Sequence, residues 1–147
     1  MSEKVRLDQE RKNRYLDKVE KIEIRTADIE EWIGELSEAD FERDKKTRLA
    51  TYKAFQELVE AAADICAMYA SDTVKAVGDD YENIGKAAGG LYPEGLREHL
   101  ERSNGLRNRL VHEYNHLNNK IAHDSIKELL PSFKEFVRGV REWIKSK

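Results

Sequence analysis

The sequence has very little that would break or cross-link a chain. Its 147 residues include one cysteine, two prolines and eight glycines. The single cysteine, Cys66, excludes an internal disulfide, and its small and apolar neighbours favour a buried structural thiol over a reactive one. Scarce helix breakers, together with abundant Glu, Lys, Arg, Leu and Ala, predict long helices with solvated faces.

The sequence also lacks a long apolar run and an excess of positive charge. No stretch approaches the roughly 20 apolar residues that a membrane-spanning helix needs, and the first residues show no signal-peptide pattern. We therefore expect a cytoplasmic protein without a membrane segment. The formal net charge of −3 argues against a protein that coats nucleic acid without selectivity, although a small local basic site stays open.

The spacing of the apolar residues predicts an all-α fold. Residues 7–36 keep a helical period without a proline, and Ser37 is placed to cap a second helix that runs to about residue 71. A short helix over 81–88, a helix from Pro93 to about 117 and a last helix over 124–144 follow. Long helices with short links predict an antiparallel four-helix bundle with an extra short helix, forming a single domain over residues 1–147.

The helix predicted after Pro93 has an unusual polar face. At about 100° per residue, its apolar side carries Leu106, Leu110, Tyr114 and Leu117. Its opposite side carries Asn108, His112, Asn115, His116 and Asn119. Amides and imidazoles donate and accept hydrogen bonds without a fixed charge, which suits a contact surface or a ligand site. A polar seam between helices, or a helix terminus capped by asparagines, explains the same residues.

The spacing of Arg107 and His112 adds a constraint. Five residues apart on a straight helix, the two side chains point about 140° away from each other. They converge on one substrate only if the helix distorts or if a second copy of the chain supplies the missing partner. A two-fold dimer does the latter, because its interface doubles whatever lies near the axis.

The same residues carry a resemblance to a known family. Arg107, four residues, His112, one residue and Tyr114 match the Arg-x4-6-His-x-Tyr signature of HEPN domains, and residues 106–114 look specifically like HepT-type toxins. Residues 44–65 are similar to the second helix of that family. The segment 80–84 and the turn at Pro93 also fall where the family has a short helix and a proline, so the resemblance covers nearly the whole chain.

The resemblance implies a dimeric helical toxin that cleaves RNA without a metal or another cofactor. Arg107 and His112 match the catalytic pair, and Tyr114 matches the motif tyrosine. In this family a minimal nucleotidyltransferase antitoxin is the partner, and the resemblance implies that it attaches AMP to Tyr114. The residue chemistry agrees, because imidazole exchanges protons near neutral pH and guanidinium forms a charged fork for phosphate. Asn108, Arg109 and Tyr114 are then candidates for binding the RNA substrate.

Other interpretations of the chain stay open. The main alternative is a helical interaction module that binds a nucleotidyltransferase partner without cutting RNA. A nucleotide-binding domain is disfavoured, because no phosphate-cradling glycine loop is present. Arg102, Arg107, Arg109 and Lys120 are expected to form a basic cluster that offsets the acidic net charge.

Single residues also have structural alternatives. Arg107 could form an ion pair with Glu101 or Glu113, and Tyr114 could be a core residue with its hydroxyl at the rim. His116 and His123 are expected to be structural or surface residues, and no metal site is predicted.

Overall fold

The computed structural model describes residues 5–147, except for the side chain of Tyr114. Its elements are α1 (Gln9–Ile33), α2 (Glu38–Arg43), α3 (Lys45–Thr73), α4 (Asp80–Ala87), η1 (Glu94–Leu96), α5 (Arg97–His112), η2 (Tyr114–His116) and α6 (Asn119–Lys145). The predicted all-α class is confirmed: helices dominate the described residues, and the only β-type pairing in them is an isolated bridge between Ala88 and Tyr92.

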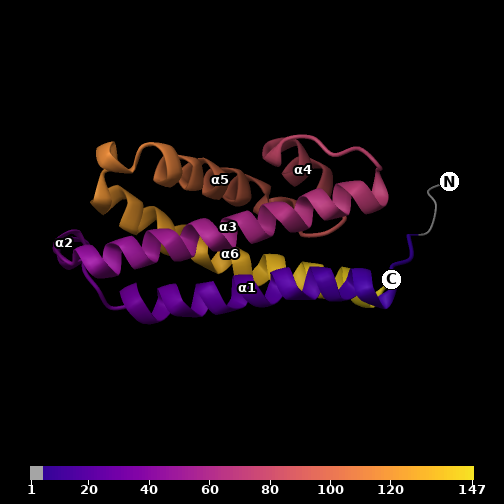
Figure 1. The fold of residues 1–147 in the computed structure, drawn as a ribbon, viewed down its shortest axis with the longest axis horizontal. Coiled ribbons are helices and arrows are strands. Elements are labelled where there is room, and N and C mark those ends of the chain that lie inside the picture. The colour runs from indigo at the N-terminus through magenta and orange to yellow at the C-terminus, as the bar shows by residue number, and fades with distance from the viewer. Residues whose placement is uncertain (1–4) are drawn as a thin grey trace.

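Helices α1, α3 and α6 run along the length of the molecule, and the shorter α5 covers part of it (Figure 1). Helix α3 lies between α1 and α5, α6 lies behind them, and the short α4 packs beside α5 on α3. One core cluster joins all of these elements, and its largest fully buried side chains include Tyr15, Phe41, Phe55, Phe133 and Phe136. No helix among the described residues is long and apolar enough to cross a bilayer.

The second predicted helix is divided in the structure. Ser37 caps it as expected, with its hydroxyl accepting the Asp40 amide at 3.1 Å. Asp44 then ends α2 and begins α3, because its carboxylate accepts both the Thr47 amide at 3.0 Å and the Thr47 hydroxyl at 2.8 Å. Aspartate competes with helix continuation in this way, and the spacing of apolar residues does not reveal it.

The helix predicted from Pro93 to about residue 117 ends earlier, at His112. A short 3₁₀ segment follows, and α6 begins at Asn119 rather than at 124. Asn118 caps α6, with its side-chain oxygen accepting the amides of Lys120 and Ile121 at 3.1 Å each. The asparagine-rich stretch is therefore a turn between two helices, consistent with the capping preference of asparagine.

Candidate functional site

Arg107 is anchored between α5 and α3. Its Nε and Nη2 donate to Oε1 of Glu60 at 3.2 and 2.8 Å, and its Nη1 donates to Oδ1 of Asn108 at 2.8 Å. The Arg107 side chain keeps 24% of its surface exposed. The alternative of a structural ion pair for Arg107 is thus met, but its partner is Glu60 of another helix and not Glu101 or Glu113, and Glu101 pairs with Arg97.

Glu60 was not among the residues predicted from the sequence. Its Oε1 also accepts the Gln56 side-chain amide at 3.1 Å. Burial opposes ionisation of Glu60, but the hydrogen bonds from Arg107 and Gln56 outweigh it, so the pKa of this carboxyl lies below its ordinary value. The sequence feature that could have pointed to Glu60 is a carboxylate between Val59 and the apolar run 61–63. Glu60 is therefore a charged, fixed partner of the motif arginine.

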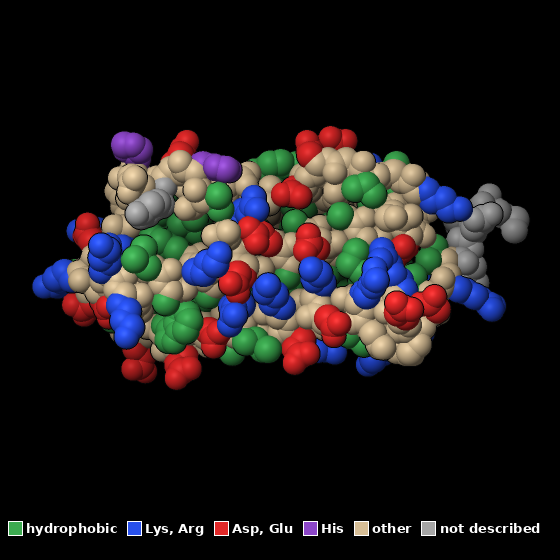
Figure 2. Space-filling model, in the orientation of Figure 1, with side chains coloured by type: hydrophobic (Ala, Val, Ile, Leu, Met, Phe, Trp, Pro, Cys, Tyr) green, Lys and Arg blue, Asp and Glu red, His purple; other side chains and the backbone are tan. Residues whose placement is uncertain are grey.

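His112 is the last residue of α5, and its side chain is exposed. It forms no hydrogen bond or ion pair with any residue that the structure describes. Histidine side chains stand on the outer edge of the molecule near the end of α5 (Figure 2). His112 is thus open to solvent and available to a substrate or to another chain.

Arg107 and His112 do not come together within one copy of the chain. Helix α5 is an unbroken α-helix from Arg97 to His112, so no distortion brings the two side chains onto one side. Arg107 turns toward Glu60 on α3, whereas His112 stands at the helix end. The helix distortion that the spacing left open is therefore absent from α5.

The other predicted site residues have different surroundings. Asn108 is half-buried and accepts a hydrogen bond from Arg107, which leaves its amide nitrogen available. Arg109 is exposed and pairs with no carboxylate of the described residues. The predicted roles of Tyr114 concern its side chain, which lies outside the described residues, and its backbone belongs to η2.

The predicted polar face is wrong as a continuous helical surface, because α5 ends at His112. Asn119 accepts the hydroxyl of Tyr52 at 2.6 Å and thereby ties the start of α6 to α3. Asn119, and its neighbour Asn118 as the cap of α6, thus perform the structural tasks left open as the alternative. Asn115 and His116 are exposed.

The expected basic cluster is largely neutralised. Arg102 forms a two-point contact with Glu128 at 3.0 and 3.1 Å, and Arg107 pairs with Glu60. Lys120 lies 3.8 Å from Glu42. Arg109 is therefore the one cation of the predicted four that has no carboxylate partner in the described part of the chain.

Two further predictions concern side chains outside the motif. His123 is structural: its Nε2 lies 2.9 Å from the Leu36 carbonyl oxygen, and its ring packs on Phe41. Cys66 is buried, and burial raises the pKa of its thiol, so it is unreactive as predicted. The described residues contain no group of three or more His, Cys, Asp or Glu side chains that could hold a metal ion.

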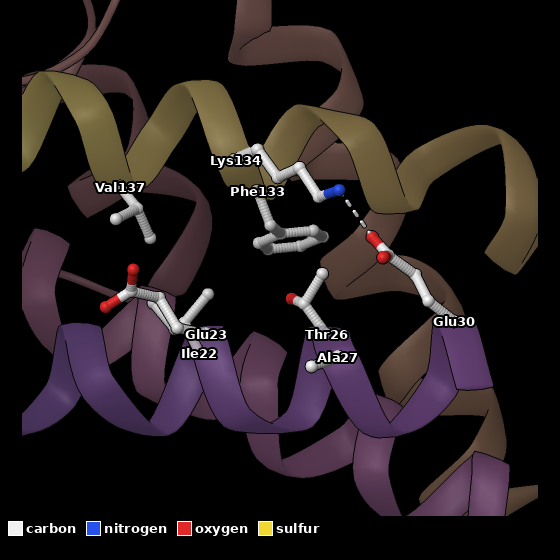
Figure 3. A pocket seen from close by; sticks show the side chains of 8 residues that line it. All are labelled: Ile22, Glu23, Thr26, Ala27, Glu30, Phe133, Lys134 and Val137. Atoms are coloured by element: carbon white, nitrogen blue, oxygen red, sulfur yellow. Dashed lines mark ion pairs between the residues drawn. The ribbon is translucent and has the colours of Figure 1, made fainter. Parts of the chain in front are cut away.

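A groove lies between α1 and α6 (Figure 3). It has a volume of about 330 Å³ and is lined by Ile22, Glu23, Thr26, Ala27, Glu30, Phe133, Lys134 and Val137. Both of its carboxylates pair with cations of α6, Glu30 with Lys134 at 2.7 Å and Glu23 with Arg141. The Thr26 hydroxyl is buried and has no hydrogen-bond partner among the described residues. No histidine lines the groove, and both of its acids are paired.

Comparisons with known proteins agree with the motif. The model of the family described as "Ribonuclease HepT-like" matches residues 22–140. Two Archaeoglobus fulgidus proteins named "Putative RNase" are similar. One is 32% identical over 90% of this chain and 94% of its own length. The other is 37% identical over 73% of this chain and 76% of its own length.

Solved structures show the same fold. A tri-AMPylated Shewanella oneidensis HEPN toxin in complex with MNT antitoxin has a TM-score of 0.80 at 21% identity and covers 92% of this chain and 99% of its own. A toxin–antitoxin crystal structure with AMP-PNP has a TM-score of 0.78 at 20% identity and covers 91% and 99%. With the family model matching most of the chain, the protein belongs to the HepT-like ribonuclease family.

Proposed function

We propose that this chain is a metal-independent endoribonuclease toxin that acts as a homodimer. The observation that carries the proposal is the pair formed by an anchored Arg107 and an open His112 on one regular helix. In the dimer, Arg107 of one copy and His112 of the other face the same RNA phosphate. The family membership and the relatives named as RNases support this assignment.

The chemistry requires only groups that the RNA and the chain carry. The 2′-hydroxyl attacks the adjacent phosphorus while His112 removes its proton, and the bond from phosphorus to the 5′-oxygen breaks. A proton then returns to the departing 5′-oxygen. Arg107 stabilises the extra negative charge on the phosphate oxygens in the transition state. The products are a 2′,3′-cyclic phosphate and a free 5′-hydroxyl.

The partner in this proposal is a minimal nucleotidyltransferase antitoxin. It silences the toxin by transferring AMP from ATP to the Tyr114 hydroxyl, with pyrophosphate as the leaving group. The structural similarity to a tri-AMPylated HEPN toxin bound to MNT antitoxin supports this partner. Tyr114 lies two residues after His112 in the sequence, which supports a modification beside the cleavage site. Exposed Arg109 and the amide of Asn108 contact the RNA backbone.

Cleavage of total RNA and of tRNA in EDTA tests the nuclease assignment. The intact mass is measured first, so that only chain without added AMP is assayed. We expect wild type to produce cyclic-phosphate ends, and His112→Ala to lower the rate by about 10²- to 10⁴-fold, the usual contribution of acid–base catalysis. Arg107→Ala is expected to be similarly impaired.

The controls decide between nuclease and interaction module. Both variants count as folded only if they keep the helical circular-dichroism signal and the thermal midpoint of wild type. If unmodified, folded wild type leaves every RNA intact, the nuclease assignment is wrong and a partner-binding module takes its place. If EDTA abolishes cleavage, the metal-independent mechanism is wrong.

A further inference from the structure

The carboxylates of α3 differ in the helix that they contact. Asp72, Asp64 and Glu57 each pair with a cation of α1, at 2.9, 2.8 and 2.6 Å. Glu60 is the one carboxylate of α3 that turns to α5, where it contacts Arg107 at 2.8 Å. The salt bridges of α1 and α3 therefore do not account for Glu60.

Glu60 fixes one side of the Arg107 guanidinium. A single oxygen, Oε1, accepts both Nε and Nη2, while Asn108 accepts Nη1. These three bonds use three of the five N–H groups of an arginine and leave one on each terminal nitrogen. An N–H group on each terminal nitrogen is what an end-on bidentate contact with two phosphate oxygens uses.

We infer that Glu60 is the positioning residue of the cleavage site, which holds Arg107 so that its two remaining N–H groups face the RNA phosphate. The inference rests on the proposed function and adds a residue to it. Arginine has a long, flexible side chain, so an unheld guanidinium would spend its time in many rotamers. Prior orientation removes that cost at the moment of reaction.

Glu60 does not itself move a proton in this scheme. Its three donors converge on Oε1, and the hydrogen bonds from Arg107 and Gln56 keep the pKa of the carboxyl below its ordinary value despite burial. The group stays ionised at the pH at which RNA cleavage is assayed. It acts on the reaction only through the position of Arg107.

Three variants on α3 test the inference. Glu60→Ala removes the acceptor, and we expect kcat for RNA cleavage to fall about 10- to 100-fold with KM changed less than about threefold, since misplacing a reacting group by an ångström has effects of this size. Glu60→Gln keeps an acceptor oxygen in place and should stay within about fivefold of wild type. Glu57→Ala is the matched control, because it breaks an interhelical ion pair one turn away on the same helix.

Either of two results would overturn the inference. One is wild-type kcat for folded Glu60→Ala; the other is an equal loss in Glu57→Ala, which would trace the effect to general loosening of α3. Thermal midpoints of all three variants are measured as well. A loss of stability alone lowers the fraction of folded protein but leaves kcat per folded chain unchanged.

A readout that needs no cleavage separates this inference from the nuclease proposal. The Nε–H proton of Arg107, assigned by its disappearance in Arg107→Lys, is expected to exchange slowly with water in wild type and in Glu57→Ala. It should exchange at least about tenfold faster in Glu60→Ala, because its acceptor is gone. If RNA is never cut but this protection follows Glu60, the nuclease proposal fails while the anchoring of Arg107 stands. Equal exchange in all variants refutes the anchoring.

Discussion

The seam between α1 and α3 and the end of α5 use the same charged residue types in opposite ways. Along the seam, Arg11, Lys18 and Arg25 recur every seven residues on α1 and meet Asp72, Asp64 and Glu57 on α3. The partners run in opposite order, so the two helices are antiparallel. In this ladder each cation has a carboxylate from the neighbouring helix.

At the end of α5 the charges and polar groups are not paired in this regular way. Arg107 is held by one carboxylate and one amide with part of its fork free, Arg109 has no carboxylate partner among the described residues, and His112 is open to solvent. A ladder in which each cation meets a carboxylate of the other helix orders the two helices. An arginine that is anchored but keeps free N–H groups is available to a ligand.

Mixing two inactive variants gives the largest expected effect. Arg107→Ala and His112→Ala are each expected to be inactive alone, yet a heterodimer has one site in which Arg107 and His112 are both intact. After subunit exchange in an equal mixture, half of the dimers are heterodimers with one of two sites restored, so about a quarter of wild-type activity should return. The measurement is RNA cleavage by the exchanged mixture.

The double variant provides the control for this mixing experiment. Chains carrying both substitutions, mixed with either single variant, have no intact composite site and should remain inactive. Analytical ultracentrifugation confirms that dimers form in every mixture. If heterodimers form without regaining activity, Arg107 and His112 of different copies do not share a site. The difference between the α1–α3 ladder and the end of α5 would then not mark a catalytic site.

Arg109 is expected to have an intermediate effect, on binding rather than on chemistry. The affinity for RNA is measured as a function of salt concentration. In a plot of log affinity against log salt concentration, Arg109→Ala should make the slope shallower by about 0.7, the value for one contact to a single-stranded phosphate. The probe is a fully 2′-O-methylated RNA, which has no free nucleophile.

Arg138→Ala is the comparison for Arg109. It removes an arginine of α6 that is also exposed and has no carboxylate partner in the described residues. Its salt dependence should equal that of wild type. The same change of slope in both variants would mean that RNA senses the overall charge and not the end of α5.

The sequence predicted the helices well where the apolar spacing is continuous. The buried residues of α1 and α6 recur with a helical period, and neither helix has an internal capping residue strong enough to end it. The break at Asp44 and the start of α6 at Asn119 were missed, because Asp44 and Asn118 each cap a helix by accepting backbone amides. Such local hydrogen bonds leave no trace in the pattern of apolar residues.

The motif residues were predicted from the sequence, but their surroundings were not. The match of Arg107, His112 and Tyr114 to the family signature is a property of adjacent positions, whereas Glu60 lies 47 residues away from its partner. A contact between helices depends on their register, which one sequence does not reveal. For the same reason the predicted basic cluster failed, since Glu128 and Glu42 come from other helices.

The smallest expected effect comes from breaking the ladder itself. Arg25→Ala removes contacts with Glu57 at 2.6 Å and Asp28 at 2.9 Å, and we expect a loss of about 0.5 to 1 kcal/mol in unfolding free energy at neutral pH, with unchanged cleavage per folded chain. The hydrogen bond from Arg25 lowers the pKa of Glu57. The pair therefore stabilises the fold above the ordinary pKa of glutamate and ceases to do so as the pH falls through the lower pKa of folded Glu57. Urea unfolding should show wild type and variant converging in acid, and a loss of cleavage as large as that of Glu60→Ala would show that the seam is part of the site.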